Sequence, residues 1–77
     1  MYTEAEKRDL QNIGNNIRRL RSEKGYSQES FADAVALHRT YMGGVERGER
    51  NLSALNLLKI MRKLEAQPNE IFSGVCV

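Results

Sequence analysis

The sequence predicts an all-α fold, a single domain of five helices without strands. Apolar residues recur at spacings of three and four along most of the chain, and no alternation with a period of two is sustained. Gly25, Gly48 and Pro68 interrupt this pattern and divide it into segments of helical length. A chain of 77 residues buries only a small core, so association with a second copy would add useful burial.

The first helix is expected over about residues 4–23. Thr3 and Glu6 fit a capping box, in which the hydroxyl and the carboxylate each accept a hydrogen bond from a backbone amide at the helix end. Gly25 suits the left-handed residue that follows a helix. One apolar stripe is formed by Leu10, Ile13, Ile17 and Leu20.

Two short helices joined by a tight turn follow. Ser27 is a favourable N-cap for a helix over about residues 28–35, and the turn is placed at Ala36 and Leu37. The next helix is expected over about residues 38–47. The inward faces of this pair are formed by Phe31, Ala32, Val35, Leu37, Tyr41, Met42 and Val45.

The C-terminal part, residues 54–77, is predicted to mediate dimerisation. Ser53 caps a helix over about residues 54–64, and Pro68 precedes a last helical turn at about 69–72. The expected core stripe of the longer helix is Ala54, Leu57, Leu58, Met61 and Leu64. Other apolar residues are left for an exposed patch, which indicates a partner surface unless they seal the chain's own core. The candidate dimer residues are Leu55, Ile60, Ile71, Phe72 and Val75, with Val77 beside them.

Composition narrows the classes of function. The formal net charge is only +2, but most of the 12 basic residues lie between positions 18 and 50, which favours a local nucleic-acid contact. No apolar run approaches the roughly 20 residues that a membrane helix needs, and the N-terminus lacks a secretory signal, so we expect a cytoplasmic protein. The clustered basic residues are Arg18, Arg19, Arg21, Lys24, Arg39, Arg47 and Arg50.

The chain offers little for catalysis. The single cysteine, Cys76, forms neither an intramolecular disulfide nor a structural zinc site alone. His38 has no second histidine and no nucleophile motif beside it, so an ordinary polar residue at a helix start is the simpler interpretation. We therefore expect no enzymatic activity, no metal, no cofactor and no small-molecule ligand.

The helix at 38–47 has the chemistry to read DNA, because it combines an apolar back with an Arg/Thr front. Arg39 is the strongest candidate for a base-reading residue, since arginine can donate two hydrogen bonds to guanine. Thr40 would contact a thymine methyl group or a phosphate. Tyr41 either packs inward or reaches DNA with its hydroxyl, and Gly43 and Gly44 either permit close approach or are simply tolerated.

Phosphate contacts are expected on both sides of this helix. Ser27 and Gln28 lie at the N-terminus of the preceding helix, where backbone amides can bind an anion. Arg47, Arg50 and Asn51 belong to the loop that follows the reading helix. The alternative for each is a plain cap or loop residue.

These features resemble the Cro- and repressor-type, or XRE-like, helix-turn-helix family. The resemblance runs from Ile17 to Phe72 and implies a compact five-helix lambda-repressor-like DNA-binding domain, with its helix-turn-helix at about 28–47. Arg39-Thr40-Tyr41, followed by ERGERN at 46–51, is similar to the controller proteins of restriction–modification systems. Those proteins are small homodimeric regulators, and their likeness adds Arg50 to the candidate base-reading residues.

The same resemblance implies further roles. Arg21 and Glu46 match an ion pair that joins the first and third helices in the family. Glu29 and Asp33 match an acidic face that contacts RNA polymerase in related regulators, although a solvated helix face is the simpler alternative. Ala36 stands where the family usually has glycine, and a left-handed alanine costs about 1–2 kcal/mol.

The sequence thus predicts a homodimeric, sequence-specific transcription regulator that binds double-stranded DNA at a palindromic operator, most similar to a restriction–modification controller. Two alternatives stay open. One is a phage-type repressor or an antitoxin on the same scaffold. The other is a helical protein-interaction module that does not read DNA, which would lack salt-dependent DNA binding.

Overall fold

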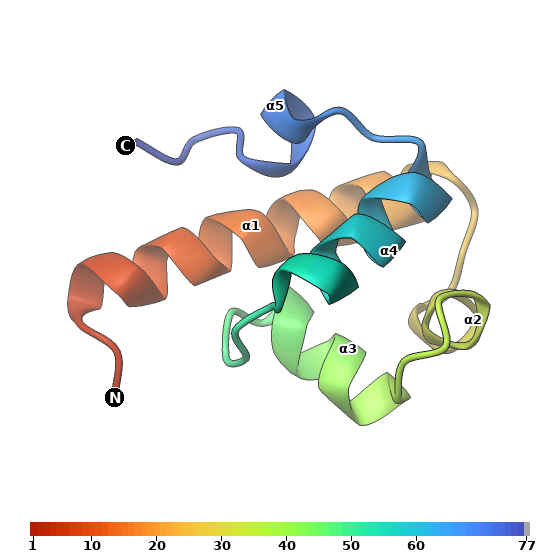
Figure 1. Cartoon of the computed structure of the whole chain (residues 1–77), viewed down its shortest axis with the longest axis horizontal. Coiled ribbons are helices and arrows are strands. Elements are labelled where there is room, and N and C mark those ends of the chain that lie inside the picture. Colours follow the sequence, from red (N-terminus) through yellow and green to blue (C-terminus); the bar gives the residue numbers. More distant parts are fainter. Residues whose placement is uncertain (77) are drawn as a thin grey trace.

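The computed structural model describes residues 1–76, and these form five α-helices and no strand (Figure 1), which confirms the predicted all-α class. The helices are α1 (Glu4–Glu23), α2 (Gln28–Ala34), α3 (Arg39–Glu46), α4 (Ala54–Leu64) and α5 (Pro68–Ile71). Figure 1 shows α1 running along the molecule, with α5 on one side and α3 on the other. Among residues 1–76, no helix is both long and apolar enough to cross a membrane.

Side-chain caps fix where the helices begin. The α1 capping box is present: the Glu6 amide donates to Thr3 Oγ1 at 3.1 Å, and the Thr3 amide donates to Glu6 Oε1 at 2.8 Å. Gly25 follows α1 with a φ of +84°, the left-handed conformation expected for it. The N-caps are therefore local features that the sequence predicts well.

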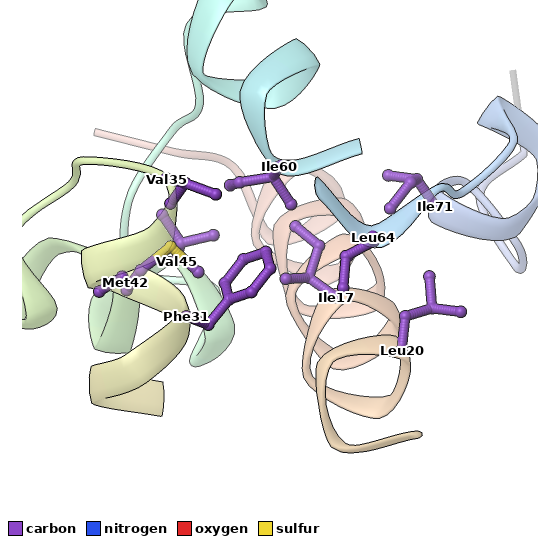
Figure 2. Close-up of a cluster of buried hydrophobic side chains, with 10 residues drawn as sticks. Ile17, Leu20, Phe31, Val35, Met42, Val45, Ile60, Leu64 and Ile71 are labelled. Carbon is purple, nitrogen blue, oxygen red and sulfur yellow. The ribbon is translucent and has the colours of Figure 1, made fainter. Parts of the chain in front are cut away.

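The core draws at least one fully buried side chain from every helix. Ile17 of α1 and Phe31 of α2 are each 0% exposed, and Figure 2 shows them facing one another. Burying each such side chain contributes about 1.5–3 kcal/mol. The whole cluster is Ile17, Leu20, Phe31, Ala32, Val35, Met42, Val45, Ile60, Leu64 and Ile71.

Two of the predicted dimer residues belong to this core, and their assignment to an exposed patch is wrong. Ile60 and Ile71 are 0% exposed, because Ile60 lies against the α2 side of the core and Ile71 closes its α5 side (Figure 2). The inward stripe of α4 is accordingly rotated from the expected one, with Ala54 and Leu58 exposed. The true stripe is Leu57, Ile60, Met61 and Leu64.

Some apolar side chains do stay at the surface. Leu55, Leu58 and Phe72 are 73%, 37% and 38% exposed, and Val75 is half-buried. Val77 lies outside the described residues. Asn16 of α1 holds the segment that carries Phe72, since its Nδ2 donates to the carbonyl oxygens of Ile71 and Ser73 at 2.8 Å each. The exposed and half-buried side chains of Leu55, Leu58, Phe72 and Val75 are together called the C-terminal apolar surface below.

The turn between α2 and α3 contains the expected strain. Ala36 has a φ of +58°, so it adopts the left-handed conformation that favours glycine. The Leu37 amide donates to the Ala32 carbonyl at 2.9 Å and the Ala36 amide to the Asp33 carbonyl at 3.1 Å. These two bonds form a Schellman motif, which ends α2 and sets the direction of α3.

Candidate nucleic-acid interface

An open hollow of about 440 Å³ lies between the start of α2 and the outer side of α3. Met42 and Val45, on the opposite side of α3, are buried in the core, so the outer side faces solvent. Arg39, Thr40 and Arg47 are all exposed there. We call this area the α2–α3 surface; its lining residues are Gln28, Glu29, Arg39, Thr40, Gly43 and Arg47.

Arg39 lies at the first position of α3 and is paired with an acidic residue of α2. Its Nη1 donates to Glu29 Oε2 at 2.7 Å, and the two side chains are 67% and 73% exposed. The sequence predicted the exposure of Arg39 but gave no sign of this partner. The pair joins residues ten positions apart on different helices, so no helical spacing rule indicates it.

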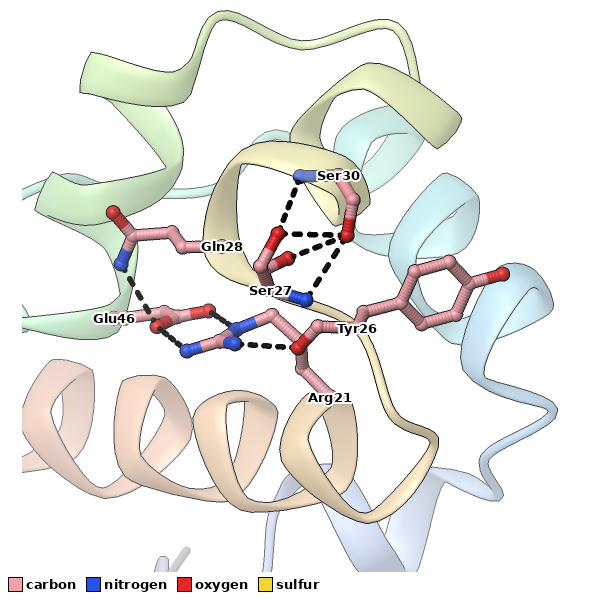
Figure 3. A network of polar contacts seen from close by, with 6 residues as sticks. All are labelled: Arg21, Tyr26, Ser27, Gln28, Ser30 and Glu46. Atoms are coloured by element: carbon pink, nitrogen blue, oxygen red, sulfur yellow. Dashed lines mark hydrogen bonds and ion pairs between the residues drawn. The ribbon is translucent and has the colours of Figure 1, made fainter.

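A buried polar network holds the inner end of α3 (Figure 3). Arg21 contacts Glu46 through two donors, with Nε to Oε2 at 2.6 Å and Nη2 to Oε1 at 3.0 Å. Their side chains are only 10% and 2% exposed. The third Arg21 donor, Nη1, reaches the Tyr26 carbonyl at 2.8 Å. This is the pair that the family resemblance implies, and it ties α1, α3 and the segment before α2 together.

Gln28 extends this network toward the α2–α3 surface. Its Nε2 donates to Glu46 Oε1 at 3.0 Å (Figure 3), which engages one of its two N–H donors inside the protein. Ser27 acts as the N-cap, since its Oγ accepts from the Ser30 amide at 3.0 Å. Ser30 was not among the predicted residues, yet its hydroxyl accepts from the Ser27 amide at 2.9 Å and completes a capping box.

The ring of Tyr41 points inward and its hydroxyl points outward. The ring packs against the core, and the hydroxyl donates to the Asn51 carbonyl at 3.0 Å. Asn56 Nδ2 donates to the same hydroxyl at 3.4 Å. Tyr41 therefore connects α3 to the following loop and to α4. In this supporting role its hydroxyl is already hydrogen-bonded within the chain.

The two glycines of α3 are buried, and the atoms nearest to them belong to side chains of their own chain. A Cβ on Gly43 would lie 3.0 Å from Arg47 Nη1 and 3.1 Å from Gln28 Oε1. A Cβ on Gly44 would lie 2.6 Å from Arg50 Cγ. Glycine thus makes room for the side chains of Gln28, Arg47 and Arg50 against α3.

The loop after α3 is basic and exposed. Gly48 turns it with a φ of +76°, and Arg47 Nε donates to Glu49 Oε1 at 3.1 Å. Arg50 and Asn51 are exposed beside it. No group of three or more His, Cys, Asp and Glu that could hold a metal ion occurs in residues 1–76. His38 Nδ1 accepts from the Thr40 amide at 3.1 Å as the cap of α3.

Comparisons with known proteins agree with this geometry. The family model HTH_3, described as Helix-turn-helix, matches residues 17–71. Control protein C.MunI of Mycoplasma sp is 46% identical over 82% of this chain and 86% of its own, and control protein C.BamHI of Bacillus amyloliquefaciens is 42% identical over 77% and 74%. The crystal structure of the restriction-modification controller protein C.AhdI from Aeromonas hydrophila has a TM-score of 0.79 and 48% identity, over 84% of this chain and 98% of that one. The chain therefore belongs to the HTH_3 (XRE-like) helix-turn-helix family of DNA-binding transcription regulators, which are not enzymes, and it is similar to restriction–modification controller proteins.

Proposed function

We propose that the chain is a restriction–modification controller that binds a palindromic DNA operator as a homodimer, with α3 of each copy in a major groove. The observation that carries this proposal is that one short helix, α3, has two different faces. Its inner face is held by the Arg21–Glu46 pair and the core, while Arg39 and Thr40 stand exposed at its start. Such a helix is rigid where it packs and polar where it would meet base edges.

The residues divide by chemistry. Arg39 supplies paired donors for guanine, Thr40 contacts a thymine methyl or a phosphate, and Arg50 reaches base edges from the loop. The phosphate backbone is bound by Ser27, Gln28, Arg47 and Asn51. Tyr41, Gly43 and Gly44 support these side chains, since each is engaged within the chain. Phosphate contacts give affinity and register, and base contacts give sequence choice.

The homodimer would form through the C-terminal apolar surface. Leu55, Phe72 and Val75 are the predicted residues of that surface that reach solvent, and Leu58 joins them. A two-fold pair presents its reading helices symmetrically, so the operator half-sites would be inverted and about one helical turn apart. Asp33, on the outer side of α2, stays a candidate contact for RNA polymerase.

Selection of bound duplexes from a random pool tests the proposal. The wild-type chain should recover an inverted repeat, and Arg39→Ala should lose preference at one position in each half-site. Arg62→Ala is the matched control, because it removes an exposed arginine from α4, outside the α2–α3 surface. Enrichment of no sequence by the wild-type chain would contradict the proposal, as would a monomer in sedimentation at micromolar concentration.

A further inference from the structure

We propose that Glu29 is a specificity-determining residue, which holds the Arg39 guanidinium for guanine and weakens its attraction to any other DNA. This inference rests on the proposed function, because it assigns a role within the same DNA-reading surface. It starts from the contact between Arg39 Nη1 and Glu29 Oε2 at 2.7 Å.

The geometry leaves part of the guanidinium available. An arginine carries five N–H donors, and the contact with Glu29 uses Nη1 alone. The donors on Nε and Nη2 can still meet the two acceptors of a guanine edge. A carboxylate that holds one nitrogen also restricts the rotation of a long side chain, so less freedom is lost when a base is bound.

The charges of Glu29 and Arg39 affect the binding of operator DNA and of unrelated DNA differently. Sequence-independent binding depends on the net positive charge that faces the phosphates. While Glu29 is paired with Arg39, the two side chains contribute no net charge to the α2–α3 surface, and the carboxylate repels nearby phosphates. A guanine in the right place compensates by offering acceptors to Arg39, whereas unrelated DNA does not. Glu29 should therefore weaken unrelated binding more than operator binding.

The same helix provides a matched control. Asp33 lies one turn after Glu29 on α2 and is also exposed, but among residues 1–76 it forms no ion pair. Asp33→Asn removes one negative charge close to the same surface without touching Arg39. Any effect of bulk charge should appear in both variants, and an effect of the contact should appear only in Glu29→Gln.

The test measures dissociation constants for an operator duplex, obtained by the selection above, and for a scrambled duplex of equal length at one salt concentration. Glu29→Gln should lower the specificity ratio, which is the dissociation constant for the scrambled duplex divided by that for the operator, by about two- to fivefold, the range expected for an exposed ion pair. Asp33→Asn should leave the ratio unchanged. In an Arg39→Ala background, Glu29→Gln should no longer alter the ratio, as a double-mutant cycle requires.

Three results would overturn the inference: an unchanged ratio in Glu29→Gln, an equal fall in Asp33→Asn, or an effect that persists without Arg39. Circular dichroism melting of every variant separates these outcomes from misfolding. A wild-type chain that does not prefer the operator would contradict the proposed function itself. A wild-type chain that does prefer it, together with an unaffected Glu29→Gln, would contradict only the role of Glu29.

Discussion

The side chain of Arg50 crosses α3 directly over Gly44, so closely that a Cβ at position 44 would lie 2.6 Å from Arg50 Cγ. Glycine within a helix costs about 1 kcal/mol relative to alanine. The absence of a side chain at position 44 leaves the space that Arg50 occupies, with its Cγ, Cδ and Nε against the reading helix.

Gly44→Ala should therefore separate folding from DNA binding. The added methyl group gains helix propensity but displaces Arg50, so the melting temperature should change little while operator affinity falls about five- to 100-fold, the size of one lost arginine contact. Titration of a labelled duplex and thermal unfolding measure the two effects. Arg50→Ala is the comparison, and retention of full affinity in Gly44→Ala alone would show that Arg50 does not act from this position.

Glu46→Ala should be the most destabilising substitution near the site. It leaves Arg21 buried and without its carboxylate, which typically costs about 3–5 kcal/mol. Urea unfolding should show this loss, and operator affinity should fall with it because α3 is no longer anchored to α1. Glu49→Ala, which breaks the exposed pair with Arg47, should cost about 1 kcal/mol or less. Equal stability of these two variants would show that the buried pair contributes nothing.

Ala36→Gly should stabilise the protein. The left-handed φ of +58° costs alanine about 1–2 kcal/mol, and glycine removes that strain. Part of this gain in stability is lost, because the greater conformational entropy of glycine in the unfolded chain costs about 0.4–1 kcal/mol more on folding. A net increase of about 0.5–1 kcal/mol in the free energy of unfolding is expected. Ala34→Gly, at a right-handed helical position, should destabilise; a loss of stability in both variants would contradict the proposed strain.

Leu55→Lys should convert the proposed dimer to a monomer without unfolding it. Leu55 is 73% exposed, so a charged side chain is tolerated in the single chain but not in an apolar interface. Sedimentation velocity of the variant and of Ser22→Lys, an exposed control on α1, gives the comparison. Persistence of the dimer in Leu55→Lys would place the interface elsewhere.

Local chemistry made much of this fold predictable. The capping hydroxyls of Thr3, Ser27 and Ser53 and the left-handed Gly25 act within a few residues, so the sequence indicates them directly. The rotation of α4 was not predictable in this way. Ala54 and Leu58 are four residues apart, while Leu57, Ile60, Met61 and Leu64 also recur at spacings of three and four, so two apolar stripes are possible. Only the packing of α4 against the rest of the core decides which stripe is buried.

The candidate site likewise has features that the local sequence predicts and features that depend on how the helices pack. The exposure of Arg39 follows from the periodicity of α3, but its contact with Glu29 depends on the angle between two helices. The reason for Gly44 lies in a loop residue six positions later. Pairing of Arg21 with Glu46 was implied only by resemblance to a family, since nothing in the spacing of 25 residues indicates it.

The network of Arg21, Glu46 and Gln28 limits how the reading helix could be exchanged between proteins. A transplant of the whole of α3 from a protein without glutamate at the position of Glu46 would leave the buried Arg21 guanidinium without its carboxylate. Redesign of operator preference is better restricted to Arg39 and Thr40, which face outward and share no bond with that network.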